Sequence, residues 1–216
     1  MARSGRPRSF DDSQVVNGAK NVFWQQGYAA TSMRDLQQTL GVLPGSLYGA
    51  FGDKHALFLR ALQRYADDGG AVAASLPADG PILPRLRELL TNVLTAARIA
   101  PGRGCMLGNT AAEVLPDDAA AGRVVRGAFR ELEGAIEQAL QLAHQAGETR
   151  DHVDCGAQAR LLVALMQGLH VLARAEDDPQ RLQDAIDAAL TPLAHDHNAA
   201  HAACGERRQP RSARFD

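Results

Sequence analysis

A short segment near the start of the chain, residues 32–54, carries the residue types that bind nucleic acid. Gly41, Val42 and Leu43 join two short amphipathic stretches, and this spacing is typical of a helix-turn-helix. On the second stretch Leu47 and Phe51 lie four residues apart and face a core, which leaves its other positions free to face a major groove. These positions are Pro44, Gly45, Ser46, Tyr48 and Gly49. The spacing alone also fits a small helical core with a tight corner between two helices.

The ends of this segment and the N-terminal arm carry polar and basic side chains that are suited to contact phosphate. Ser32 and Arg34 lie at the start of the first stretch, and Lys54 begins the helix after the second, where backbone N–H groups and a cation can hold an anion together. The N-terminal arm carries three further arginines, which could enter an adjacent minor groove. They are Arg3, Arg6 and Arg8. The alternative for this arm is a solvated tail.

The charge of the 216-residue chain is divided unevenly. The formal net charge of −2 and the pI near 6.4 exclude a uniformly basic nucleic-acid coat. Residues 1–65 nevertheless hold eight basic and four acidic residues, whereas residues 66–198 hold eleven and nineteen. A basic head on an acidic body suggests a polyanion-binding module attached to a second function.

The elements that position these residues are expected to be helices alone, because apolar residues recur at helical spacing and alternating strand patterns are absent. Asp11, with Gln14 as a capping-box partner, begins a helix that ends at Gly27, and Ser32 with Asp35 begins another. Later helices are expected at 44–51, from 53 to a frayed end near 69, and at 85–98, 105–115, 117–147, 151–174 and 179–193. The expected divisions are a basic arm (1–10), a helix-turn-helix domain (11–60), a six-helix domain (61–195) and an unfolded tail (196–216).

Two runs in residues 11–60 resemble the DNA-binding domain of TetR-family regulators. They are Phe23-x3-Gly27-Tyr28-x2-Thr31-Ser32-Met33-x2-Leu36 and Leu40-Gly41-Val42-x2-Gly45-Ser46-Leu47-Tyr48-x2-Phe51-x2-Lys54-x2-Leu57. The resemblance implies an all-α homodimer that binds a palindromic DNA operator, usually as a repressor released by a small molecule. It matches Tyr48 and Lys54 to phosphate contacts and residues 43–46 and 49 to the groove-facing set. Leu43 and Gly49 depart from the family's usual polar and bulky residues, which limits direct base readout.

The 105–115 stretch carries a polar stripe, Cys105, Asn109 and Glu113, beside an apolar one, as the wall of an internal pocket would. Cys105 also lies at a helix N-terminus, where thiols can react with electrophiles, so a cysteine-based sensor is an alternative to a plain packing role. The candidate pocket residues are Cys105, Met106, Asn109, Glu113, His144, Met166, Gln167 and His170.

The last two helices carry more apolar side chains than one small domain needs to cover itself. In the TetR family this pair forms a four-helix bundle with its twin. The candidate dimer residues are Leu161, Leu165, Leu169, Leu172, Leu182, Ile186, Leu190 and Leu193. Packing within one chain is the alternative.

Other function classes find little support. No nucleotide-binding glycine loop, nucleophile elbow or paired-carboxylate spacing indicates an enzyme, and no cofactor is implied. Three cysteines are too few for a disulfide framework, and no signal peptide or membrane-spanning run is expected, so a cytoplasmic protein without membrane contact is predicted. His195, His197, His201 and Cys204 could bind zinc, but their spacing fits no ordered finger, and no metal site is assigned. A helical ligand-binding protein without a DNA role is the alternative from another class.

Overall fold

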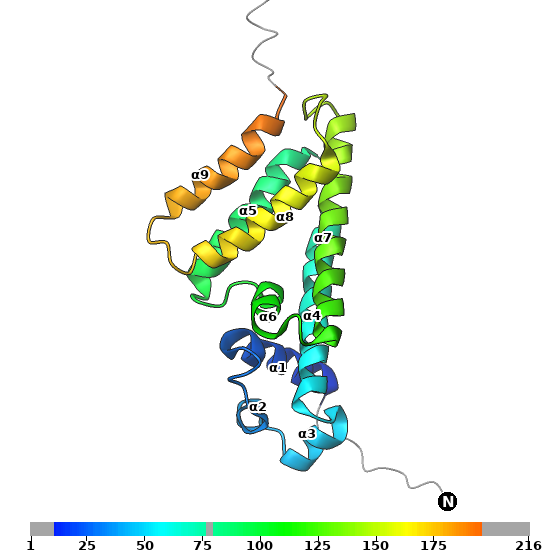
Figure 1. The fold of residues 1–216 in the computed structure, drawn as a ribbon, viewed down its shortest axis with the longest axis vertical. Helices are drawn as coiled ribbons and strands as arrows, with labels where there is room; N and C mark the ends of the chain where they lie inside the picture. Colours follow the sequence, from blue (N-terminus) through cyan, green and yellow to red (C-terminus); the bar gives the residue numbers. More distant parts are fainter. Residues whose placement is uncertain (1–10, 77–79, 196–216) are drawn as a thin grey trace, which may run out of the picture.

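The computed structural model describes residues 11–76 and 80–195, and within them the chain is helical, with no β-strand (Figure 1). The all-α prediction is confirmed. The helices are α1 (Asp12–Gln26), α2 (Met33–Leu40), α3 (Pro44–Phe51), α4 (Lys54–Ala74), α5 (Ile82–Ile99), α6 (Met106–Val114), α7 (Ala119–Gln145), α8 (Cys155–Leu172) and α9 (Pro179–Leu190), followed by a 3-10 turn at Thr191–Leu193.

Short polar side chains fix most helix starts, as the sequence indicates. Ser32 and Asp35 form a reciprocal capping box on α2, and Asp53 accepts a hydrogen bond from the backbone N–H of Ala56 at the start of α4. Asp11 caps α1, but through the N–H of Ser13 and not in a box with Gln14. Six of the described helices (α1, α2, α4, α7, α8 and α9) therefore begin after a capping aspartate or serine, whereas α3, α5 and α6 begin without a side-chain cap.

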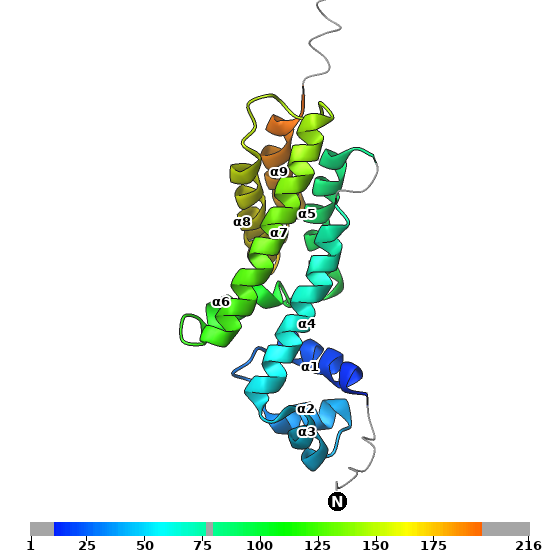
Figure 2. The same ribbon diagram turned by 90° about the vertical axis from the view of Figure 1, so that its right-hand side faces the viewer.

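The helix boundaries differ from the expected ones where packing outweighs local propensity. The pair Gly69 and Gly70 was expected to fray α4, but the helix continues to Ala74 because it packs along α7 (Figure 2). Helix α5 begins at Ile82, three residues earlier than expected, since Pro84 is tolerated within a first helical turn. Helix α8 begins at Cys155, after the cap Asp154, and so starts four residues later than the expected residue 151.

The molecule is elongated, with α1–α3 at one end and α5, α8 and α9 at the other (Figures 1 and 2). The long helices α4 and α7 lie side by side and connect the two ends. One core cluster joins α1–α4 to residues 105–107 of the α6 region and to Ala121 and Val125 of α7. A second cluster joins α5, α7, α8 and α9. The first core thus extends past residue 60, and α4 crosses that position without a break.

Helix α8 is the one helix among the described residues that is long and apolar enough to cross a membrane by length and composition alone. Its buried side chains, including Leu162 and Leu169, pack in the second core, whereas Leu161 and Val171 on its other side are exposed. A core helix of a soluble protein passes the same test. The apolar character of α8 therefore comes from two faces, only one of which is covered within the chain.

Candidate nucleic-acid interface and internal cavity

Helix α3 presents an open surface at the end of the molecule. Leu47 and Phe51 are buried and anchor it, while the side chains of Leu43 and Tyr48 are 75% and 51% exposed. No atom lies within 4 Å of where a Cβ would stand on Gly45 or Gly49, so these positions face open space. Pro44 is exposed and Ser46 half-buried. The structure thus brings residues 43–46, 48 and 49 onto one accessible surface.

The start of α3 has no side-chain cap. Leu43 holds the N-cap position and offers only its backbone carbonyl, which accepts from the N–H groups of Ser46 and Leu47. The backbone N–H of Gly45 lies in the first turn of this uncapped helix. The helix dipole favours a negatively charged group at such an N-terminus. A phosphate oxygen at this position would supply the cap that the side chain of Leu43 cannot.

The flanking polar residues are placed differently from one another. Arg34 is exposed near the surface formed by α2 and α3. Ser32 is engaged with Asp35 in the capping box, so its hydroxyl already has a partner. Lys54 donates from Nζ to the carbonyl oxygens of Tyr28 and Thr31, both at 2.8 Å, and lies 4.2 Å from the centre of the Tyr28 ring. Lys54 therefore holds the α1–α2 turn within the protein, in addition to its predicted contact with phosphate. Arg3, Arg6 and Arg8 lie outside the described residues.

The α1–α2 turn is also held from the opposite side by Glu113 of α6. Its two carboxylate oxygens accept from the backbone N–H groups of Tyr28 at 2.9 Å and Ala29 at 2.7 Å. Gly27 precedes these groups with φ +83°, and a Cβ on it would lie 3.1 Å from a Glu113 oxygen. The position thus requires glycine for its backbone conformation and for the close approach of the carboxylate. Glu113, a predicted pocket residue, lines a pocket of ≈ 350 Å³ at this junction together with Asn109, another predicted one.

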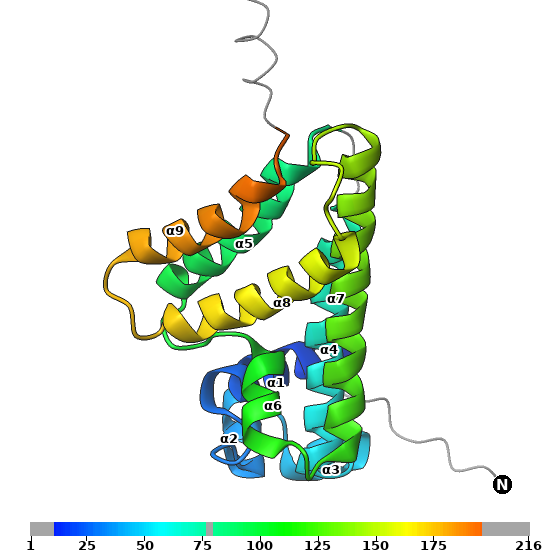
Figure 3. The same ribbon diagram turned by 45° about the horizontal axis from the view of Figure 1, so that its top comes forward.

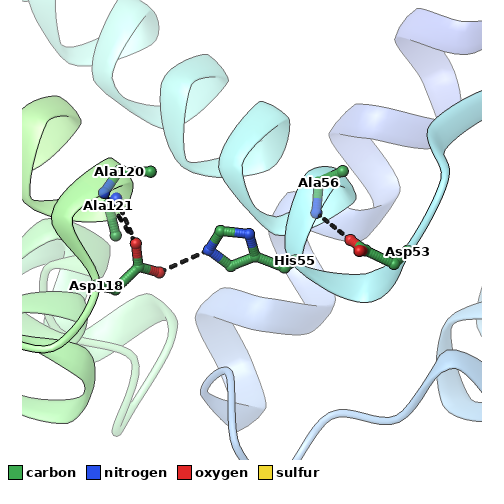
Figure 4. Close-up of polar contacts among 6 residues, drawn as sticks. All are labelled: Asp53, His55, Ala56, Asp118, Ala120 and Ala121. Carbon is green, nitrogen blue, oxygen red and sulfur yellow. Dashed lines mark hydrogen bonds and ion pairs between the residues drawn. The ribbon is translucent and has the colours of Figure 1, made fainter.

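A second junction joins α4 to α7 (Figure 4). The Nε2 atom of His55 lies 2.7 Å from one Asp118 oxygen, while the other oxygen accepts from the N–H groups of Ala120 and Ala121 at the start of α7. The hydrogen bond from Ala121, followed by that from His55, holds the pKa of Asp118 below its ordinary value. The α7 cap is therefore tied directly to the first turn of α4.

A third junction joins α1 to the loop before α6. The Arg103 guanidinium lies 4.5 Å from the Trp24 ring centre, and its Nε donates to Gln25 at 3.1 Å. The indole N–H of Trp24 in turn donates to the Gly104 carbonyl oxygen at 2.9 Å. Contacts on both sides of α6 therefore link the α1–α3 end to the rest of the chain.

An internal cavity of ≈ 330 Å³ lies between α4, α5, α7 and α8, with the residues around the start of α6 at its base. Its walls are mainly apolar, with polar side chains from four helical regions. Four predicted pocket residues line it: Cys105, Met166, Gln167 and His170. Tyr65, Asn92 and Phe129 also line it, and residue types alone do not identify them, because they come from three helices far apart in the chain.

The other four predicted pocket residues lie elsewhere. Met106 is buried in the first core, and Glu113 binds the α1–α2 turn. The amide of Asn109 donates to the Arg103 carbonyl oxygen at 2.7 Å, outside this cavity. His144 is exposed, and its Nδ1 lies 3.1 Å from the Thr149 hydroxyl. The polar stripe of α6 thus divides between the cavity and the junction with α1.

The apolar residues assigned to a dimer surface also divide into two groups. Five are buried in the second core of the single chain, so they cannot contact a second copy: Leu169, Leu182, Ile186, Leu190 and Leu193. The apolar side of α9 packs against α5 (Figure 3). Arg87 of α5 and Asp187 of α9 also form an ion pair. Leu161 and Leu172 are exposed, and Leu165 is half-buried. Of the predicted dimer residues, those that remain accessible therefore all lie on α8.

Comparisons with known proteins agree with this arrangement. Residues 15–61 match the model of bacterial regulatory proteins of the tetR family, and residues 82–189 match a tetracyclin repressor-like C-terminal domain. The HTH-type transcriptional regulator YezE of Bacillus subtilis is 33% identical over 192 residues, which are 88% of this chain and 99% of that protein. The HTH-type transcriptional repressor ComR of Escherichia coli is 28% identical, over 79% of this chain and 82% of that protein.

Solved structures show the same fold. A cysteine variant of the TetR-family regulator CifR, complexed with 26-base-pair operator DNA, superposes with a TM-score of 0.75 at 26% identity, covering 88% of this chain and 100% of that one. A TetR regulator from Chloroflexus aurantiacus gives a TM-score of 0.72 at 28% identity, covering 83% and 91%. With both family models and a full-length relative in agreement, the chain belongs to the tetR family of bacterial regulatory proteins and is a DNA-binding transcriptional regulator, not an enzyme.

Proposed function

We propose that the protein is a homodimeric cytoplasmic repressor that binds a palindromic operator and releases it when a small molecule occupies the cavity. The observation that carries this proposal is the position of the α6 region. Cys105 and Leu107 line the cavity, while Glu113, less than two turns further on, holds the turn that leads into α2. A ligand that displaces α6 therefore also displaces the DNA-binding helices.

The operator contacts would come from the exposed surface of α3 and its neighbours. Leu43 and Pro44 offer apolar contact to a thymine methyl group, and Ser46 and Tyr48 offer hydroxyl groups. Gly45 and Gly49 let the backbone approach the groove closely. Arg34 is free to meet a phosphate, and the remaining N–H of the Lys54 ammonium group can do so without leaving the α1–α2 turn.

The dimer contact would be the exposed face of α8. Ala157, Leu161, Ala164, Gly168 and Val171 are spaced alternately four and three residues apart, the 3.5-residue period of helices that pack along a shared seam. Four of these residues are exposed, and nothing lies within 4 Å of where a Cβ would stand on Gly168. Small side chains along this line let two helices approach closely, so this face fits a second copy of α8.

The test is recovery of an operator by the full-length protein. DNA selected from a random pool is expected to contain an inverted repeat, and mobility shifts are expected to show one cooperative complex of two protomers. Selection of a single, non-repeated half-site by a monomer would contradict the proposal.

Tyr48→Phe tests the contact made by the α3 hydroxyl group. Each protomer is expected to lose one hydrogen bond to a charged phosphate, which is worth roughly 1.5–3 kcal/mol. Affinity should therefore fall by about tenfold or more for each half-site, and by about 100-fold or more for two protomers on the full operator. The thermal unfolding midpoint should not change, because the side chain is exposed. Mobility shifts and thermal unfolding measure the two quantities. Unchanged affinity would show that this hydroxyl group does not meet DNA.

Cys105 favours a second candidate function, in which the regulator senses an electrophile. Its buried thiol lines the cavity, whereas Cys155 lies outside it, and burial raises the pKa of the Cys155 thiol. Substoichiometric N-ethylmaleimide is therefore expected to modify Cys105 before Cys155, as measured by mass spectrometry of peptides. Equal labelling, or faster labelling of Cys155, would exclude this function.

A further inference from the structure

The cavity is lined without any charged side chain. Its described lining residues include no aspartate, glutamate, lysine or arginine, although the chain carries forty-eight such residues, 23 basic and 25 acidic. The aromatic rings of Tyr65 and Phe129 and aliphatic residues such as Leu89 and Leu132 form most of the wall. A bound ion would lose its hydration here without meeting an opposite charge, so the cavity disfavours charged ligands.

Two polar side chains on α8, Gln167 and His170, are available to a ligand. They lie three residues apart on one face, and within the described part of the chain no hydrogen bond is formed by either side chain. Burial lowers the pKa of His170, so its imidazole is neutral at neutral pH and offers one donor and one acceptor. The Gln167 amide adds two donors and an acceptor.

The size and the opening of the cavity limit what can enter. Its volume of ≈ 330 Å³ is near the lower end of the roughly 300–1,000 Å³ range of ligand pockets. The lining residues Gly69 and Val72 of α4 and Asn92 and Ala96 of α5 are exposed, so the cavity opens between these helices. A ligand therefore passes between small and apolar groups to reach the α8 side chains.

We infer that the effector is an uncharged, mainly apolar molecule about the size of two fused aromatic rings, with one hydrogen-bonding group that meets Gln167 and His170. This inference rests on the proposed function, because it names the ligand class of the proposed effector site. Apolar burial supplies the affinity, and the two α8 side chains fix the orientation.

Two matched series of probes test the class by titration calorimetry on the full-length protein. The first is 2-acetylnaphthalene, 2-naphthoate and 2-naphthylmethylamine, and the second is undecan-2-one, undecanoate and undecylamine. In at least one series the neutral ketone is expected to bind at least about tenfold more tightly than both charged members. Tighter or equal binding of a charged member, or no binding of either ketone, would overturn the inference.

The double variant Gln167→Leu/His170→Phe tests the polar end of the site. In the native protein 2-acetylnaphthalene should bind more tightly than the matched hydrocarbon 2-ethylnaphthalene. In the variant this preference should disappear, while 2-ethylnaphthalene still binds. Gln138→Leu, on the exposed side of α7, is the matched control and should keep the preference. A preference that survives in the double variant would place the hydrogen-bonding group elsewhere and contradict the inference.

The operator complex separates failure of this inference from failure of the proposed function. Release by a charged compound that binds in the cavity would overturn the ligand class and leave the repressor intact. Binding of a ketone without any effect on the operator complex would support the ligand class and overturn its role as effector.

Discussion

Ala164→Arg is expected to convert the proposed dimer to a monomer and to weaken operator binding by at least about 100-fold, because linked binding of two half-sites adds roughly 10²–10⁴ in avidity. Ala164 is exposed at the middle of the α8 seam, between Leu161 and Gly168. In a symmetric pair the substitution would place two long cations near the same axis, where small side chains allow the helices to meet. Because the residue faces outward in one chain, the fold of the protomer should survive.

Light scattering coupled to size exclusion measures the state of association, and mobility shifts measure the affinity for the operator. Ala71→Arg is the matched control, since it adds the same charge at an exposed position of α4 away from the seam. The control should remain a dimer with native operator affinity. A dimeric Ala164→Arg protein with native affinity would show that α8 is not the interface.

Glu113→Gln is expected to separate ligand binding from operator release. The amide can accept from only one of the N–H groups of Tyr28 and Ala29, and its own NH₂ group would oppose the other. Coupling between two sites is typically worth about 5- to 150-fold in affinity, and we expect the ligand effect on the operator to fall below about threefold. Ligand affinity should be unchanged, because Glu113 lies outside the cavity.

The measurement compares operator affinity with and without a cavity ligand, alongside calorimetry of that ligand. Glu88→Gln is the control, because it makes the same charge change at an exposed position of α5. If Glu113→Gln keeps the full ligand effect, the coupling does not pass through this carboxylate. The bond between His55 and Asp118 would then be the next route to test, with Asp118→Asn.

Local chemistry made the DNA-binding end predictable from sequence. The caps Ser32 and Asp53, Pro44 at a helix start, and the spacing of Leu47 and Phe51 each act within a few residues, so the sequence reports them directly. The family resemblance placed Tyr48 on the surface that the structure exposes.

Long-range partners could not be predicted in the same way. The partners of Glu113 are backbone N–H groups 84 and 85 residues away, and backbone groups leave no signature in the residue types. Helical periodicity identified the apolar face of α9, but it does not identify what covers that face. An apolar face can pack within the chain or against a second protein, and here it packs on α5 of the same chain. Tyr65 and Phe129 reach the cavity only after α4 and α7 have packed side by side.

The shared first core has a consequence for building chimaeric regulators. Cys105, Met106 and Leu107 with Ala121 and Val125 complete the core of the DNA-binding helices, so a module cut after α4 would expose that apolar surface to water. The DNA-binding unit that could be moved to another protein is therefore discontinuous in sequence. It consists of α1–α4 together with α6 and the first two turns of α7. A sensor half from another protein could be grafted only through the remaining helices.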